Sequence, residues 1–122
     1  MGTAFLSCPE ANIGIDYRMA LNAATDDGTR LTRAFSGRPA RAMNNRYIEA
    51  MAERRREFPD FPTMYAFSEP LENACRDSAN SGFEFFLWGQ GAPLNRELSA
   101  GELVTRLVKE TQDALKFASG SR

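Results

Sequence analysis

The sequence contains no histidine, and this absence removes several classes of enzyme site. A Ser-His-Asp triad, a Cys-His pair and a zinc or iron site with histidine ligands cannot be built from these residues alone. Cys8 and Cys75 stand far apart, in neither a CxxC pair nor another metal-ligand spacing. Two isolated cysteines do not make the disulfide framework of a small secreted domain, so we expect reduced thiols. No metal site is predicted.

Long apolar runs and phosphate-loop motifs are missing as well. No segment approaches the about 18 consecutive apolar residues of a membrane span, and the first ten residues lack the basic start of a signal peptide. Neither GxGxxG nor the GxxxxGKS and GxxxxGKT forms occur, which excludes a dinucleotide or ATP site of those types. We therefore expect a cytoplasmic protein without membrane association. Its 122 residues, 43% of them hydrophobic, suit one domain with a modest core.

Positive charge is distributed unevenly, although the formal net charge is only −1. Arginine supplies 13 of the 15 basic residues, and eight arginines lie between Arg30 and Arg56 against two glutamates. Such a block can bind the phosphates of RNA or DNA, or it can be a solvated face paired with acids elsewhere. The second reading is the commoner one for a run of charge, and both stay open here.

The first part of the chain predicts a short strand, a helix and a hairpin. The apolar run at residues 3–6 indicates a strand. Asp16 is expected to cap a helix that continues to about residue 24. Alternation over residues 30–35, a turn at 36–39 and an extended run at 40–43 together predict a β-hairpin.

The middle of the chain predicts two helices separated by a loop. Asn44 or Asn45 is expected to cap the first helix, and two prolines predict an ordered loop over residues 58–67. Pro70 suits the first turn of the second helix, which should end near residues 80–82. The positions expected to face the core from these helices are Tyr47, Ile48, Met51, Ala52, Leu71, Ala74 and Cys75.

The last helix has the strongest local signals. Residues 99–102, Ser-Ala-Gly-Glu, form a capping box, and an apolar stripe at helical spacing follows it. We expect this stripe to be buried, against the chain's own residues or against a second copy. Its members are Leu103, Val104, Leu107, Val108, Thr111, Leu115 and Ala118.

Two further features have a functional and a structural interpretation. Asp26 and Asp27 could act as a general-acid pair or as ligands for a hard metal ion, but adjacent side chains at a helix end usually face solvent. Trp88, beside several phenylalanines, could be a stacking platform and is more often part of a core. Neither feature identifies a reaction.

Four segments do match one family, in the order in which that family has them. The chain resembles the C-terminal part of the nitronate monooxygenases, formerly called 2-nitropropane dioxygenases. The likeness extends over essentially all of the chain, and the stretch Ala-Phe-Ser-Gly-Arg-Pro-Ala-Arg is its most specific part. The matching segments are residues 1–6 (MGTAFL), 31–41 (LTRAFSGRPAR), 45–51 (NRYIEAM) and 87–90 (LWGQ).

The resemblance implies an α/β fold, an FMN-binding TIM barrel with a small domain inserted after its eighth strand. Residues 1–6 would then be the end of strand eight, and residues 7–96 the inserted substrate-side domain of mixed helices and a β-hairpin. Residues 97–122 would be the final barrel helix and a tail. A barrel of this kind needs about 250 residues, so the chain on its own should be mostly helical, of α+β type.

The resemblance also implies which residues contact the cofactor. Met1, Gly2 and Thr3 correspond to the family's FMN-phosphate segment, and Gln90 is a further candidate for cofactor binding. The family's catalytic-base histidine falls outside this chain, so no catalytic residue is expected within it. Arg38 and Arg41 are interpreted as structural, near acids or the barrel rim.

The implied activity is that of an oxidoreductase which oxidises alkyl nitronates with O₂ to a carbonyl compound and nitrite. The expected partners are the nitronate, O₂ and either the rest of the barrel or a second copy, without a membrane or nucleic acid. Within this interpretation the chain is a truncated product or one piece of a split enzyme and is inactive alone. The alternatives are an arginine-rich module that binds phosphate or nucleic acid, and an inactive structural remnant.

Overall fold

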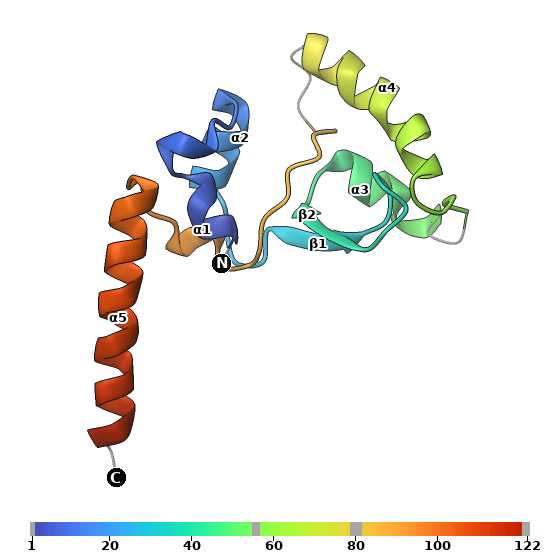
Figure 1. Cartoon of the computed structure of the whole chain (residues 1–122). Coiled ribbons are helices and arrows are strands. Elements are labelled where there is room, and N and C mark those ends of the chain that lie inside the picture. The colour runs from blue at the N-terminus through green and yellow to red at the C-terminus, as the bar shows by residue number, and fades with distance from the viewer. Residues whose placement is uncertain (1, 55–56, 79–81, 121–122) are drawn as a thin grey trace.

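The computed structural model describes residues 2–54, 57–78 and 82–120, which form a mostly helical chain with one two-stranded sheet (Figure 1). The expectation of a mostly helical α+β chain is therefore confirmed. No helix among these residues is long and apolar enough to cross a membrane. The elements are α1 (Gly2–Leu6), η1 (Pro9–Ala11), α2 (Ile15–Asn22), β1 (Thr29–Thr32), β2 (Ala40–Met43), α3 (Arg46–Met51), η2 (Ala52–Arg54), α4 (Thr63–Asp77), η3 (Ala92–Leu94) and α5 (Ala100–Gly120).

The predicted hairpin is present, but its first strand ends at Thr32 instead of residue 35, so residues 33–39 form the connection. β1 pairs antiparallel with β2, and Thr29 lies opposite Met43. Gly37 lies in the connection with a φ of 83°, a conformation that residues with a Cβ rarely adopt. A Cβ at Gly37 would lie 2.6 Å from the backbone nitrogen of Phe61, so the turn is packed directly against the segment that precedes α4.

A first core cluster lies between the hairpin and α3. Its central ring, Phe35, stacks on Phe85 with 4.3 Å between the ring centroids. Asn45 is the residue that caps α3: its Oδ1 accepts a hydrogen bond from the Ile48 amide at 3.0 Å, and its Nδ2 donates to the Glu84 carbonyl at 2.8 Å. The buried members of this cluster are Ala34, Phe35, Ala42, Tyr47 and Ile48.

A second core cluster lies among α1, α2 and η3, with Leu21, Trp88 and Ala92 as its buried members. The extended segment 83–88 runs between the two clusters. Phe83 and Phe85 pack on the first cluster, whereas Phe86 and Trp88 belong to the second, as the period of two in extended backbone requires. One extended segment therefore contributes to both cores.

The beginning of the chain differs from the prediction. Residues 3–6 were expected to be extended as a strand end, but Gly2–Leu6 is a helix. A strand needs a neighbouring strand for its backbone hydrogen bonds, and no described strand pairs with this segment, whereas a helix satisfies them internally. The cap of α2 was also predicted wrongly. Gly14 is its N-cap, and Asp16 lies within the first turn, where a negative charge is favoured.

α4 begins earlier than predicted. The expected loop reaches only to Pro62, because the helix begins at Thr63, and Pro70 lies inside the helix instead of in its first turn. The burial of Met64, Ser68 and Cys75 on one face offsets the cost of an internal proline. Cys75 is buried as expected, but Leu71 and Ala74 are exposed. The helix ends at Asp77; Asn80 and Ser81 of the expected end lie outside the described residues.

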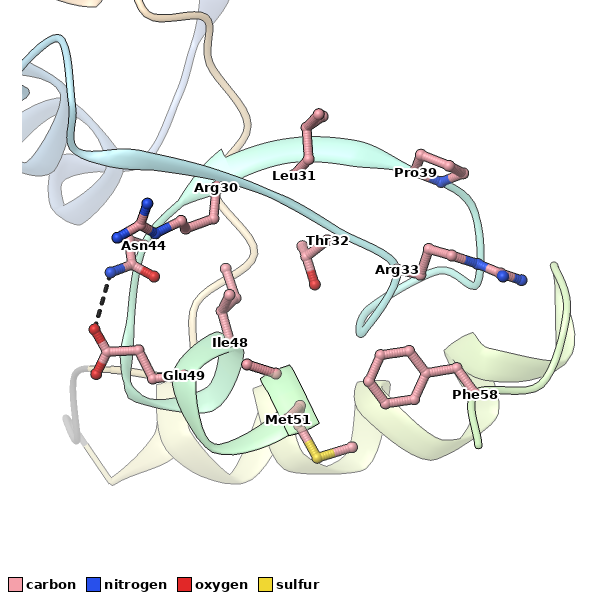
Figure 2. Close-up of a pocket in the computed structure, with 11 residues that line it drawn as sticks. Arg30, Leu31, Thr32, Arg33, Pro39, Asn44, Ile48, Glu49, Met51 and Phe58 are labelled. Carbon is pink, nitrogen blue, oxygen red and sulfur yellow. Dashed lines mark hydrogen bonds between the residues drawn. The ribbon is translucent and has the colours of Figure 1, made fainter. Parts of the chain in front are cut away.

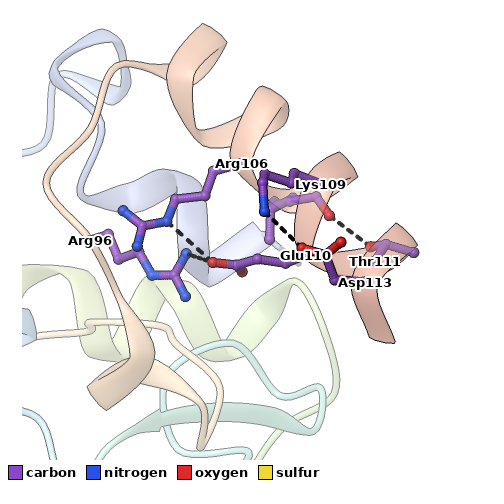
Figure 3. A network of polar contacts seen from close by, with 7 residues as sticks. Arg96, Arg106, Lys109, Glu110, Thr111 and Asp113 are labelled. Carbon is purple, nitrogen blue, oxygen red and sulfur yellow. Dashed lines mark hydrogen bonds and ion pairs between the residues drawn. The ribbon is translucent and has the colours of Figure 1, made fainter. Parts of the chain in front are cut away.

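The capping box of α5 is confirmed. A Glu102 carboxylate oxygen accepts a hydrogen bond from the Ser99 amide at 3.0 Å, and the Glu102 amide donates to the Ser99 hydroxyl at 3.3 Å. Glu110 joins Arg96, at 2.7 Å, and Arg106, at 3.2 Å, in a network that ties the helix to the segment before it (Figure 3). Arg96 is the main reason why the pKa of Glu110 is lowered.

The apolar stripe of α5 is mostly exposed, so of the two expected modes of burial the chain's own described residues do not provide the first. Leu103 is 2% exposed, but Val108 is 52% and Leu115 is 65% exposed. Beyond its first turns the helix projects away from the other described elements (Figure 1), so they provide no surface on which the stripe can pack. All side chains from residue 111 to residue 120 are exposed.

Candidate cofactor-contact site

The start of the chain and the glycine-containing loop after Trp88 meet in the structure. The Gly89 amide donates a hydrogen bond to the Thr3 hydroxyl oxygen at 2.9 Å, across 86 positions of sequence. The Gly89 carbonyl accepts from the Ala92 amide at 3.1 Å, and Ala92 is fully buried. The loop is therefore anchored on one side to α1 and on the other to the second core cluster.

Gly2 and Thr3 have the properties that an approaching phosphate requires. A Cβ at Gly2 would meet nothing within 4 Å, so the backbone there is open. A threonine hydroxyl has one proton to donate and two acceptor lone pairs. At Thr3 the bond from Gly89 uses the oxygen, and the proton has no acceptor among the described residues. These two residues fit a phosphate group; Met1 lies outside the described residues.

Gln90, the other predicted site residue, follows directly in the same loop. It is exposed, and its Nε2 donates to the Asp26 carbonyl at 3.5 Å, the long limit of a hydrogen bond. Gln90 is therefore next to the residue that contacts Thr3, but its side-chain amide points toward the turn after α2. Gly89 was not predicted as a site residue, although it lies in the matching segment 87–90 and is small enough to permit close approach.

Trp88 is part of the core, as the commoner interpretation has it. Its side chain is 4% exposed and lies 5.8 Å from the Tyr17 ring, measured between centroids. Its indole Nε1 is buried and has no hydrogen-bond partner among the described residues. A buried donor without a partner lowers the stability of the fold, so an acceptor that comes within reach of the Trp88 Nε1 would be bound favourably.

The acidic pair after α2 is exposed, as the solvent-facing interpretation predicts. Asp26 and Asp27 both lie at the surface, and an Asp27 carboxylate oxygen accepts a hydrogen bond from the Thr25 hydroxyl at 2.8 Å. The described residues contain no group of three or more side chains suited to hold a metal ion.

Most arginines of the basic block have partners inside the molecule, which favours a structural role. Arg38 and Arg41, which were expected near acids or the barrel rim, contact neutral groups among the described residues. Arg55 and Arg56 lie outside the described residues. The contacts are Arg33 with Asp60 at 2.6 Å, Arg38 above the Phe61 ring at 4.2 Å, Arg41 with Thr29 at 2.9 Å, Arg46 above the Phe83 ring at 5.9 Å and Arg54 with Glu57 at 3.7 Å.

A pocket of about 320 Å³ lies between the hairpin and α3 (Figure 2). Its lining is mixed, with Ile48, Met51 and Phe58 as apolar members and Arg30 beside the polar end. At that end Asn44 donates to a Glu49 carboxylate oxygen at 2.9 Å. The sequence analysis did not predict this pocket, because its walls come from three segments.

A solved structure has the same fold over almost all of this chain. The chain superimposes on a nitroalkane oxidase from Streptomyces ansochromogenes with a TM-score of 0.83 and 34% sequence identity, over 97% of this chain and 33% of that one. The chain belongs to the nitronate monooxygenase family, whose model matches residues 1–110. The resemblance seen in the sequence is thereby confirmed.

Curated relatives agree with this assignment. A nitronate monooxygenase of Pseudomonas aeruginosa is 41% identical over 111 residues, which are 90% of this chain and 32% of the relative. A nitronate monooxygenase of Paraburkholderia phytofirmans is 35% identical over 117 residues, 95% of this chain and 32% of the relative. The chain thus spans about a third of the length of the curated relatives that it matches.

Proposed function

We propose that this chain is the part of an FMN-dependent nitronate monooxygenase that holds the cofactor phosphate and covers the substrate cavity. The complete enzyme oxidises an alkyl nitronate with O₂ to a carbonyl compound and nitrite. FMN, when bound, supplies the transfer of electrons between the nitronate and O₂. The observation that supports this role best is the contact between Thr3 and Gly89, which joins two segments that match the family pattern.

The roles of the individual residues follow from their chemistry. Gly2 leaves the backbone open to a phosphate oxygen, and the free proton of Thr3 is donated to that oxygen. In TIM barrels, phosphate sites lie in the loops after strands seven and eight and beside a short extra helix, and α1 suits that helix. Gln90 would approach the cofactor from the neighbouring loop.

The remaining elements take the places that the family fold gives them. Residues 7–96 would form the inserted domain on the substrate side, and residues 97–122 the final barrel helix and a tail. The exposed stripe of α5 would then pack against barrel strands. Because the chain has no histidine, the family's catalytic base comes from the remainder of the barrel, and this chain contributes no catalytic residue.

A chimera tests the proposal. The matching third of the Pseudomonas aeruginosa relative is replaced by residues 1–110 of this chain, and the purified protein is assayed for bound flavin and for nitrite released from a short alkyl nitronate. We expect a yellow protein that forms nitrite. The 122-residue chain alone should be colourless after gel filtration, since phosphate contacts alone give too little binding energy to retain FMN.

Two outcomes would contradict the proposal. A folded chimera without flavin would show that this chain does not provide the phosphate contacts. A chimera with flavin but without nitrite formation would show that it does not complete the substrate cavity. Thr3→Val in the chimera should lower its flavin content, because it removes the hydroxyl proton proposed for the phosphate. Thr105→Val, on the exposed side of α5, is the matched control, since among the described residues the Thr105 hydroxyl bonds to its own helix, at the Gly101 carbonyl.

A further inference from the structure

We propose that Thr3 is a positioning residue: when a phosphate is bound, its hydroxyl holds the loop after Trp88, residues 89–91, more firmly in place. This inference rests on the proposed function, because it takes a phosphate as the ligand beside α1. It goes beyond phosphate binding, since it assigns to the Thr3 hydroxyl a second role, toward Gly89, that depends on the first.

The hydroxyl of Thr3 has the connections that such coupling needs. Its oxygen accepts the Gly89 amide proton at 2.9 Å, which leaves its own proton for an outside acceptor. When that proton is donated to an anion, the oxygen becomes a better acceptor, because hydrogen bonds in a chain polarise one another. Phosphate binding therefore strengthens the bond to Gly89.

The bond from Gly89 restrains residues 89–91, which directly follow the buried Trp88. Gly89 directly follows Trp88, whose indole Nε1 is buried without a partner among the described residues. The Gly89 carbonyl starts η3 through its bond from Ala92, a fully buried member of the second core cluster. A stronger bond between Thr3 and Gly89 thus restrains the loop between the buried residues Trp88 and Ala92. Gln90 lies in this loop and is exposed.

The 122-residue chain can be tested directly, because Trp88 is its single tryptophan. Inorganic phosphate is titrated into ¹⁵N-labelled protein, and the signals of the Thr3 and Gly89 amides and of the Trp88 indole are followed by NMR, with sodium chloride at equal ionic strength as the blank. We expect all three signals to shift together with one apparent affinity. Exchange of the Gly89 amide with deuterium should slow as phosphate is added.

Variants separate coupling from a merely structural role. Thr3→Ser keeps the hydroxyl and should retain the joint response. Thr3→Val removes it, so the apparent phosphate affinity should fall about tenfold, the usual effect of losing one charge-assisted hydrogen bond, and Gly89 and Trp88 should no longer respond. Thr105→Val should behave like the unchanged chain.

The outcomes distinguish this inference from the proposed function. If the Thr3 amide shifts with phosphate but Gly89 and Trp88 do not, the coupling is refuted while the phosphate site stands. An unaltered joint response in Thr3→Val also refutes it, since the hydroxyl would then carry nothing. If no signal responds at any phosphate concentration, the proposed phosphate role of α1 fails, and the coupling fails with it.

Discussion

Gly37 shows how one residue fixes the contact between the hairpin turn and the segment before α4. Its φ of 83° suits glycine, and the space of a Cβ is taken by the backbone of Pro59 and Phe61. Both effects oppose any larger residue, and they act through backbone atoms that cannot rotate away. The glycine in the Ser-Gly-Arg-Pro stretch is therefore required by packing as well as by the turn.

Gly37→Ala should lower the free energy of unfolding by about 2–5 kcal/mol, as the sum of the cost of the left-handed conformation and of overpacking. Urea unfolding followed by circular dichroism measures this. The control is Gly101→Ala, at a helical position where a Cβ meets nothing within 4 Å. It should raise stability by about 0.5–1 kcal/mol through helix propensity. Equal stability of the two variants would contradict our account of the turn.

Asn45 is the second residue with a large expected effect, because one side chain satisfies two backbone groups. Asn45→Ala removes the cap of α3 and leaves the Glu84 carbonyl unpaired, so we expect a loss of about 2–4 kcal/mol in the same unfolding assay. Asn73→Ala, at an exposed position of α4, should change stability by less than about 0.5 kcal/mol. A loss at Asn45 no larger than that of the control would show that water replaces both bonds.

At the scale of elements, α5 is stabilised by two carboxylates, Glu102 in its first turn and Glu110 at its midpoint. Hydrogen bonds from Ser99 lower the pKa of Glu102, and Arg96 and Arg106 lower the pKa of Glu110. An acid whose pKa is lower in the folded state stabilises that state at pH above its ordinary value near 4.5. The stabilisation is lost as the pH falls through the lowered, folded-state pKa.

We therefore expect the α5 amides to lose exchange protection as the pH is lowered from about 5 to below 4, measured by NMR on individual residues. Glu102→Gln and Glu110→Gln should each weaken this transition. Lys116→Ala removes a charge from the same helix without touching either carboxylate, and should keep it. Global acid unfolding is a poorer readout, because burial raises the pKa of Glu72 and acts in the opposite direction. Unchanged protection in both glutamine variants would contradict the prediction.

The elements that could be predicted are those whose signals lie within a few residues of each other. The capping box of α5, the Asn45 cap and the hairpin turn are all local, and the structure confirms them. α4 was predicted poorly because its N-cap, Pro62, has no capping side chain. Its first half is instead held by the burial of Met64 and Ser68, whose hydroxyl donates to the Phe35 carbonyl at 2.8 Å. α1 was misread because a short apolar run fits a strand or a helix equally.

The candidate site could be predicted only through the resemblance. Gly2, Thr3 and Gln90 have no distinctive local pattern, and it was the family match that singled them out. The contact between Thr3 and Gly89 spans 86 positions, and no periodicity or spacing in the sequence encodes such a pairing. Thr3 and Gly89 meet only because the second core cluster packs α1 against the segment that contains Trp88.

At the scale of the whole molecule, the exposed stripe of α5 should cause self-association of the 122-residue chain. Burying each large apolar side chain is worth about 1.5–3 kcal/mol, and Val108 and Leu115 are more than half exposed. We expect sedimentation at micromolar concentrations to show dimers or larger species. The double variant Val108→Glu and Leu115→Glu should sediment as a monomer with its stability kept.

The matched control for this prediction is Lys116→Glu, which changes the charge of α5 by the same two units on the helix face opposite the stripe and should leave association unchanged. If the double variant still associates like the unchanged chain, another surface forms the contact. If the unchanged chain is a monomer at all concentrations, exposure of the stripe does not drive association and the prediction is wrong.

The extended segment 83–88 limits which insertions and deletions related chains can accept. Because neighbouring side chains enter different cores, inserting or deleting one residue there would send Phe86 toward the hairpin and Phe85 toward α2. A change of two residues would keep the faces but displace Leu87 from Tyr17, whose hydroxyl accepts from its amide and donates to its carbonyl. Aromatic residues can replace one another along this segment, but its length is expected to stay constant among related chains.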